Sequence, residues 1–244
     1  MNGAPNSPAG AAGLAVPRVV TPTVAIRDRV ERFPVHRIYC VGRNFAEHAR
    51  EMGAEPSRPS EPPVFFMKPA DAVVADGATI AYPRGTSELH HEVELVVALG
   101  ADHDGVLAAA DALALVFGYA VGIDLTRRDL QARAKAKGLP WDVAKGFDQS
   151  APISAITPVA DGGHPHPDAV LALTVNERTV QRAPLADMIF SVPDVLHELS
   201  KLYDLRAGDL VFMGTPSGVG PLQPGDRFVA AVEGVAMLHG RIAG

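Results

Sequence analysis

Two acidic residues alternate with apolar ones in a strand-like run, and this is the clearest chemical signal in the sequence. Within residues 90–99, strand alternation places the carboxylates of Glu92 and Glu94 on one face and Val93 and Leu95 on the other. Two carboxylates on neighbouring positions of one face repel each other, so a divalent cation would keep both ionised. The alternative is an edge strand with a solvated acidic face.

A third acid, Asp124, follows the apolar run Leu113–Ile123 and precedes the helical segment Thr126–Lys137. Side chains at such a strand end commonly face a site. Three hard oxygen ligands suit Mg²⁺ or Mn²⁺ and leave other positions to water or substrate. Zinc is disfavoured because no pair of histidines has a zinc-like spacing with a cysteine or a third histidine. The alternative role for Asp124 is a helix N-cap.

His48 and Glu51 lie three residues apart, so on a helix they share a face. The carboxylate can then orient and polarise the imidazole, which outlines an acid/base dyad. Such a pair is also common on surface helices, and that interpretation stays open.

Two more segments have a potential role in binding. The Gly-rich turn Gly214–Gly220 can present backbone N–H groups to an anion, but it lacks the Lys-Ser/Thr pair of a P-loop. Lys145 has the aromatic neighbours Trp141 and Phe147, which can desolvate it, whereas most lysines are simply solvated.

Short strands separated by Gly or Pro must position these residues. The predicted strands are Arg37–Val41, Val64–Met67, Glu92–Leu99, Phe117–Ile123, Val170–Val175, Leu210–Met213, Phe228–Val232 and Val235–Arg241. The predicted helices are Asn44–Met52, Leu107–Val116, Thr126–Lys137 and Pro193–Tyr203, the last with Ser191 as a cap. This order is neither a β-α alternation nor a repeat, so it favours a mostly β domain with peripheral helices.

Length and composition limit the class of protein. The 244 residues are 47% hydrophobic and carry a net charge of −6, which predicts one folded domain and no nucleic-acid partner. The single cysteine, Cys40, predicts a buried thiol in a reducing, cytoplasmic setting. No run reaches the roughly 20 apolar residues of a membrane span, which predicts a soluble protein without a membrane partner.

Two segments are predicted to lie outside the core. We expect residues 1–20 to form a flexible N-terminal tail and residues 21–244 to form a single catalytic domain. The Gly and Pro content of the segment Asp161–Asp168 predicts a surface loop. Its two histidines suggest a metal site, but solvent exposure is the expected state.

Seven blocks of the sequence resemble the fumarylacetoacetate hydrolase family, from about Arg37 to Arg241. The blocks are YCVGRNFAEHAREMG (39–53), FFMKP (65–69), LHHEVELVVALG (89–100), GYAVGIDLTRRDLQ (118–131), KGLPWDVAKGFDQSAP (137–152), DMIFSVPDVL (187–196) and GDLVFMGTPSGVG (208–220). The resemblance implies an α+β, mainly β fold: a mixed β-sandwich roll of the type of the family's C-terminal domain, with peripheral helices. It is greatest for short members that cleave acylpyruvates, such as the fumarylpyruvate hydrolases of gentisate breakdown.

The resemblance also implies a role for individual residues. The implied metal ligands, for Mg²⁺ or Mn²⁺, are Glu92, Glu94 and Asp124. The implied catalytic residues are His48 and Glu51, which activate water, and Lys145, which contacts substrate oxygens. The implied substrate-binding residues are Arg43, Arg128, Gln131 and Thr215.

The implied activity is metal-dependent hydrolysis of the C–C bond of a small 2-oxo acid, fumarylpyruvate giving fumarate and pyruvate, by a cytoplasmic homodimer. The alternatives are an oxaloacetate decarboxylase or a 2-oxo-acid hydratase or isomerase of the same family, and a noncatalytic cation-binding protein. The polar, Pro-rich stretch after His48 further suggests that Arg43–Pro62 is a lid that closes over bound substrate.

Overall fold

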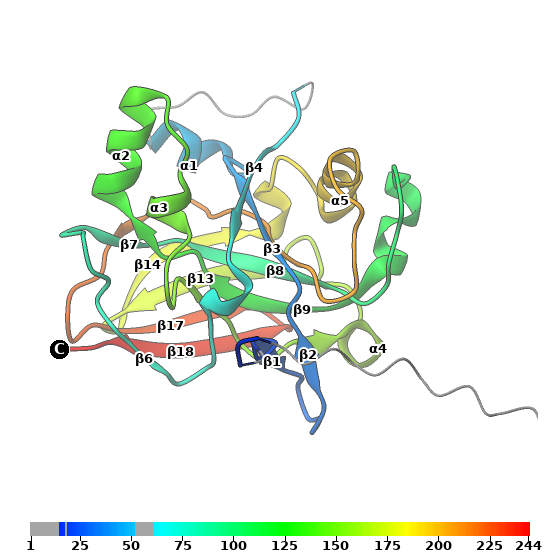
Figure 1. Cartoon of the computed structure of the whole chain (residues 1–244), viewed down its shortest axis with the longest axis horizontal. Helices are drawn as coiled ribbons and strands as arrows, with labels where there is room; N and C mark the ends of the chain where they lie inside the picture. Colours follow the sequence, from blue (N-terminus) through cyan, green and yellow to red (C-terminus); the bar gives the residue numbers. More distant parts are fainter. Residues whose placement is uncertain (1–14, 18, 52–60) are drawn as a thin grey trace, which may run out of the picture.

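Two β-sheets contain most of the strand residues of the described chain (Figure 1). The computed structural model describes residues 15–17, 19–51 and 61–244. The strands of the six-stranded sheet lie in the order β12 (Thr157–Pro158), β9 (Val116–Ile123), β8 (Val93–Leu99), β15 (Leu210–Phe212), β3 (Ile38–Gly42) and β4 (Val64–Lys68). Those of the five-stranded sheet lie in the order β14 (Arg178–Pro184), β13 (Val170–Val175), β17 (Arg227–Val232), β18 (Ala236–Ile242) and β6 (Thr79–Ile80).

Smaller elements surround the two sheets. The short strands are β1 (Thr23–Ala25) with β2 (Arg32–Pro34), β5 (Val73–Val74) with β11 (Ala151–Pro152), and β10 (Thr126–Arg127), β7 (Leu89–His91) and β16 (Gly220–Pro221). The α-helices are α1 (Ala46–Glu51), α2 (Arg128–Lys137), α3 (Asp142–Lys145), α4 (Val159–Gly162) and α5 (Val192–Ser200). The 3-10 helices are η1 (Ala70–Ala72), η2 (Ala109–Leu115) and η3 (Leu185–Asp187). None of the helices in the described part of the chain is long and apolar enough to cross a membrane.

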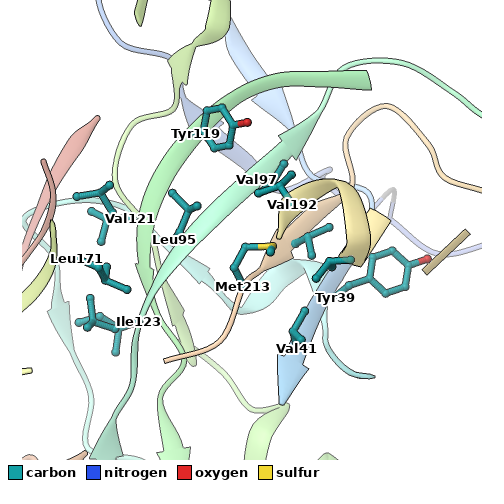
Figure 2. Close-up of a cluster of buried hydrophobic side chains, with 14 of the residues drawn as sticks. Tyr39, Val41, Leu95, Val97, Tyr119, Val121, Ile123, Leu171, Val192 and Met213 are labelled. Atoms are coloured by element: carbon teal, nitrogen blue, oxygen red, sulfur yellow. The ribbon is translucent and has the colours of Figure 1, made fainter. Parts of the chain in front are cut away.

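The main core fills the space between the sheets. Leu95 and Val97 of β8 belong to it, with Val121 of β9 and Leu171 of β13 (Figure 2). The residues that alternate with them on β8 point to the opposite face of the sheet, where Val96 packs in a second apolar cluster. This side of β8 also carries Glu94, so the strand is buried on both faces.

The mixed, mostly β architecture with helices at the periphery confirms the predicted fold class. Each of the eight predicted strands is present, and no end is shifted by more than one residue. The cap of α5 is also as predicted: Ser191 Oγ accepts a hydrogen bond from Asp194 N, and the Asp194 carboxylate accepts one from Ser191 N.

Two of the predicted helices differ from the structure. The segment predicted as the helix Leu107–Val116 is the 3-10 helix η2, because Gly100 N donates to the carbonyl of Leu115 and the chain enters β9 at once. The helix predicted from Thr126 begins at Arg128, because Thr126 and Arg127 pair with β7 as strand β10.

Cys40 is fully buried and free, as predicted, and burial raises the pKa of its thiol.

The predicted loop Asp161–Asp168 is exposed, although its first residues belong to α4. His164 Nδ1 lies 2.7 Å from the hydroxyl of Tyr119. In the described part of the chain the histidines of this loop do not join a group of three metal ligands.

Two predictions fall partly outside the described residues. Most of the predicted tail, residues 1–14 and 18, is not among them, and neither are residues 52–60 of the predicted lid. The tail and the lid therefore stay predictions.

Candidate active site

The pairing of β8 with β9 brings the three acids together. Glu92 directly precedes β8 and Asp124 directly follows β9, and Asp124 N donates to the carbonyl of Glu92 at 2.8 Å. Glu94 lies opposite Gly122, where a Cβ would come within 2.6 Å of the Phe212 ring, so this close packing requires glycine. One carboxylate oxygen from each acid lies within 4.8 Å of the others.

Two of the alternative roles for these acids are wrong. Glu92, Glu94 and Asp124 are only 5%, 1% and 0% exposed, so the solvated acidic edge strand is wrong. The N-cap position of α2 is Arg127, so the helix-cap role of Asp124 is also wrong.

Three buried or nearly buried cations surround two of the acids. Lys145 Nζ donates to Glu92 Oε2 at 2.7 Å and to Asp124 Oδ2 at 2.6 Å. Arg128 donates to Glu92 Oε1, and Lys68 Nζ lies 2.8 Å from Asp124 Oδ1. Lys145 is only 2% exposed, so the alternative of an ordinary solvated lysine is wrong.

Glu94 differs from the other two acids. In the described part of the chain no cation forms an ion pair with it, and Gly214 N donates to its Oε2 at 2.7 Å. Burial and the charges of Asp124 and Glu92 raise its pKa well above the usual range. Burial would also raise the pKa of Glu92, but Lys145 and Arg128 outweigh it and hold that pKa well below the usual range.

The donor set fits a divalent cation. Asp124 Oδ1 is buried and has no hydrogen-bond partner in the described part of the chain, although Lys68 Nζ lies near it. Glu94, which lacks a countercharge, faces the same point. Hard carboxylate oxygens of this kind are the ligands that Mg²⁺ and Mn²⁺ prefer.

Helix α1 places the predicted dyad at the same cavity. His48 Nδ1 lies 3.4 Å from Glu51 Oε2, and His48 lines the cavity together with Glu92. His48 is buried, unlike a residue of an ordinary surface pair. Burial lowers its pKa below the ordinary 6.5, against the opposing charges of Glu92 and Glu51, so the imidazole is neutral near neutral pH.

The Gly-rich turn binds the protein's own carboxylates. Gly214 N reaches Glu94, and Gly218 N donates to both Glu51 oxygens at 3.1 Å. Gly218 has a φ of +92°, and a Cβ there would lie 2.1 Å from the carbonyl oxygen of Val180. The turn therefore joins the acidic triad to the dyad.

Eight of the ten predicted site residues line one cavity: Arg43, His48, Glu92, Glu94, Arg128, Gln131, Lys145 and Thr215. The other two, Glu51 and Asp124, are attached to it by the contacts described above. The helices α1, α2 and α3, which carry several of these residues, lie together at one end of the molecule (Figure 1).

Sequence analysis missed other residues of the site. Lys68 ends the apolar strand β4, where a lone charge was the available signal. Gln181 on β14 is 1% exposed, and both ends of its side-chain amide form hydrogen bonds. Its Oε1 accepts a hydrogen bond from Val93 N and pairs with His91 Nδ1. Its Nε2 donates to Thr215 Oγ1 and to the carbonyl of Pro216. Phe66, Lys135 and Trp141 complete the wall of the cavity.

Comparison with known proteins agrees with this geometry. The family model described as fumarylacetoacetate (FAA) hydrolase C-terminal matches residues 37–243. The chain belongs to the fumarylacetoacetate hydrolase family. Its predicted fold, the β-sandwich roll of that family with peripheral helices, is confirmed by a solved structure of a fumarylpyruvate hydrolase from Pseudomonas aeruginosa in complex with Mn²⁺ and pyruvate. That structure is 43% identical, has a TM-score of 0.90, and is matched over 95% of this chain and 99% of that one.

Other members of the family similar to this chain carry another activity in their names. The mitochondrial oxaloacetate tautomerase FAHD1 of Bos taurus is 42% identical over 205 residues, which are 84% of this chain and 90% of that protein. The oxaloacetate tautomerase YcgM of Escherichia coli K12 is 40% identical over 202 residues, 83% of this chain and 90% of that protein.

Proposed function

We propose that the protein is a divalent-metal-dependent hydrolase of the C–C bond of an acylpyruvate, which converts fumarylpyruvate to fumarate and pyruvate. The observation that carries this proposal is the presence of the His48–Glu51 pair at the same cavity as the acidic triad. Metal-binding carboxylates alone would serve decarboxylation, whereas tautomerisation needs a base for a C–H proton. A hydrolase also needs a base for water, and a buried neutral histidine beside a carboxylate provides one.

Glu92, Glu94 and Asp124 would hold the Mg²⁺ or Mn²⁺. Among the described residues, Asp124 Oδ1 accepts no hydrogen bond although Lys68 Nζ lies 2.8 Å away, and Glu94 has no ion-pair partner. Both observations support this assignment. The Mn²⁺ and pyruvate in the similar hydrolase structure support both the metal and the pyruvoyl end of the substrate. The chemistry that such a cation supplies when bound is fixation of the 2-oxo and carboxylate oxygens and withdrawal of electrons from the pyruvoyl end.

His48 would act as the base. Its Nδ1 faces Glu51, which leaves Nε2 to take a proton from the water that attacks the distal carbonyl. The C–C bond then breaks, its electron pair stays with the pyruvoyl half, and protonation of that carbon gives pyruvate. The acyl half leaves as a carboxylic acid, and atoms and charges balance with one water consumed.

The remaining residues of the cavity would orient the substrate. Lys145 and Arg128 lie next to Glu92, where oxygens of the pyruvoyl end would be bound. Arg43, Gln131 and Thr215 would contact other substrate oxygens from the cavity wall.

The second candidate function is interconversion of the tautomers of oxaloacetate, with oxaloacetate decarboxylation as a related reaction. It is favoured by the named activity of the 40–42% identical relatives. The hydrolase is supported by the solved structure of the fumarylpyruvate hydrolase, which is 43% identical to this chain and was determined in complex with Mn²⁺ and pyruvate.

One assay separates the candidates. Enzyme treated with EDTA and then supplied with Mg²⁺ or Mn²⁺ is given fumarylpyruvate, acetylpyruvate or oxaloacetate in turn. We expect metal-dependent release of pyruvate together with a second acid from the acylpyruvates. Pyruvate release from oxaloacetate alone would indicate a decarboxylase, and a change of oxaloacetate absorbance without pyruvate would indicate a tautomerase.

We further propose that residues 21–244 form a single catalytic domain and that the protein works as a cytoplasmic homodimer. The buried free Cys40 supports a reducing compartment. Light scattering of the purified chain would test the dimer, and a monomeric mass would contradict it.

A further inference from the structure

Three residues of helix α2 form a row of polar groups along the cavity. Arg128, Gln131 and Lys135 follow the spacing i, i+3, i+7, which places them on one face of the helix, and all three line the cavity. With a rise of about 1.5 Å per residue, Lys135 stands roughly 10 Å along the helix from Arg128. Arg128 marks the inner end of the row beside Glu92, so Lys135 marks the outer end.

Lys135 differs in its partners from Lys145, the other lysine of the cavity, and from Lys68 beside the acidic triad. Lys68 and Lys145 form ion pairs with Asp124, and Lys145 also pairs with Glu92. Within the described part of the chain, Lys135 has no carboxylate partner, and its Nζ lies 5.3 Å from the centre of the Trp141 ring. Partial desolvation and the charge of Arg128 lower the pKa of Lys135.

Arg43 is a second cation of the cavity without a carboxylate partner among the described residues. Arg43 lines the wall with a φ of +61°, a left-handed conformation that is uncommon outside glycine and is often found at functional sites. Its charge also acts on Lys135. The outer cavity thus presents positive charge that the described residues do not neutralise.

The wall between the two ends is aromatic. Phe66 and Trp141 both line the cavity and pack edge to face, with ring centres 5.9 Å apart. Lys145 Nζ, which is bound to two of the acids, lies 5.0 Å from the centre of the Phe66 ring, and Lys135 Nζ lies beside Trp141. Going outward, the cavity therefore offers hard oxygen ligands, then an apolar aromatic surface, then an exposed ammonium. A ligand that matches this order has a 2-oxo acid at one end, a flat carbon chain in the middle and a carboxylate at the other end.

We propose that Lys135 is a specificity-determining residue that binds the distal carboxylate of a long 2-oxo dicarboxylate. The inference rests on the proposed function and names the residue that would recognise the carboxylate at the acyl end of its substrate. Oxaloacetate also has two carboxylates, but its chain is too short to lie along the α2 row from Arg128 to Lys135. The residue therefore favours a fumarylpyruvate-like substrate over oxaloacetate.

The test is a binding experiment that does not depend on turnover. Calorimetry on the Mg²⁺-loaded enzyme compares 2-oxoheptanedioate with 2-oxoheptanoate, which have the same length and differ only in the distal carboxylate. The wild type is expected to bind the diacid more tightly. Lys135→Met, which keeps the length of the side chain, is expected to weaken diacid binding by about 10- to 100-fold, the scale of a charge-assisted hydrogen bond. Its affinity for the monoacid should stay unchanged.

Lys137→Met is the matched control, because Lys137 is an exposed lysine of the same turn that does not line the cavity. It should keep the wild-type preference for the diacid. A wild type without such a preference, or a Lys135→Met variant that weakens both ligands equally, would overturn the inference.

Turnover of fumarylpyruvate by the wild type keeps the two proposals apart. A wild type that prefers the diacid through Lys135 but does not hydrolyse fumarylpyruvate would refute the proposed function and support the role of Lys135. If the wild type hydrolyses fumarylpyruvate and Lys135→Met keeps the preference for the diacid, the proposed function is supported and the role of Lys135 is refuted.

Discussion

His48 bears the largest catalytic demand placed on a single side chain of this site. It is buried, it faces the cavity, and Glu51 holds its Nδ1 side. His48→Gln should lower kcat on fumarylpyruvate by about 100-fold or more, the usual contribution of a general base. Mg²⁺ affinity, measured by calorimetry, should not change, because His48 is outside the acidic triad.

Glu47→Gln is a suitable control for this variant, since Glu47 is an exposed residue of the same helix. Its kcat should equal that of the wild type. A His48→Gln enzyme with wild-type kcat would show that the dyad takes no part in the reaction.

The protonation of His48 also predicts a pH profile. Burial lowers its pKa below 6.5, while Glu92 and Glu51 oppose that shift. Because the neutral imidazole is the active base, kcat should be constant above this pKa and fall as the pH drops through it. Glu51→Gln removes a charge that raises the pKa of His48, so the acid limb should move to lower pH. An acid limb that stays in place or moves upward in Glu51→Gln would contradict the coupling between the two residues.

Glu94 is the ligand whose loss should affect metal binding most simply, because no ion pair holds it in the described part of the chain. Glu94→Gln keeps the shape of the side chain and should weaken Mg²⁺ binding by more than about 10-fold. Ser87→Ala, a nearby exposed change, should bind Mg²⁺ like the wild type. Equal Mg²⁺ affinity in the two variants would show that the acidic group is not the metal site.

At the scale of elements, Gln181 of β14 connects the strands to the Gly-rich turn. Gln181→Met would leave buried polar partners unsatisfied, on Val93 and on the turn at Thr215 and Pro216. We expect the free energy of unfolding to fall by about 2 kcal/mol or more, as measured by urea denaturation. The kcat should fall as well, since the same turn holds Glu94 and Glu51.

Arg182→Met tests whether this effect is specific to the amide. Arg182 is the exposed neighbour of Gln181 on the same strand, so its loss should change neither stability nor kcat. Equal stability of both variants and the wild type would mean that the amide network is dispensable.

The same elements show what a sequence can and cannot predict. The strands β8 and β9 could be predicted because their apolar runs are long and end at Gly or a charge. Strand β14 escaped prediction because its residues RTVQRAP mix charges with small and apolar side chains, as an edge strand of a sheet allows. Thr126 and Arg127, which were predicted to begin a helix, form strand β10 instead, because pairing with β7 satisfies their backbone groups.

At the scale of the whole molecule, the fold brings together residues that are distant in the sequence. Lys68 meets Asp124 and Gln181 meets Thr215 only because the strands that carry or precede them are folded into the two sheets. The spacing of Glu92 and Glu94 and of His48 and Glu51 could be read locally, so these residues were predicted. Gln181 and Lys68 could not be assigned in this way, since their partners lie far along the chain.

The fold also places the acidic group and the dyad on different supports. Glu92, Glu94 and Asp124 lie in or next to two central, paired strands, whereas His48 and Glu51 lie on the short peripheral helix α1 (Figure 1). Under the proposed function, metal binding belongs to the sheet and water activation to the helix. The two functions should therefore respond separately to mutation, as the His48 and Glu94 variants are expected to show.

The most direct test of the central claim is the source of oxygen in the product. The Mg²⁺-loaded enzyme is incubated with fumarylpyruvate in H₂¹⁸O, and the fumarate is analysed by mass spectrometry. Hydrolysis assisted by His48 at the distal carbonyl predicts that fumarate gains a solvent oxygen in the new carboxylate, with an equal amount of pyruvate and no reaction in EDTA. Absence of fumarate in the presence of metal, or formation of unlabelled fumarate, would contradict C–C bond hydrolysis by this site.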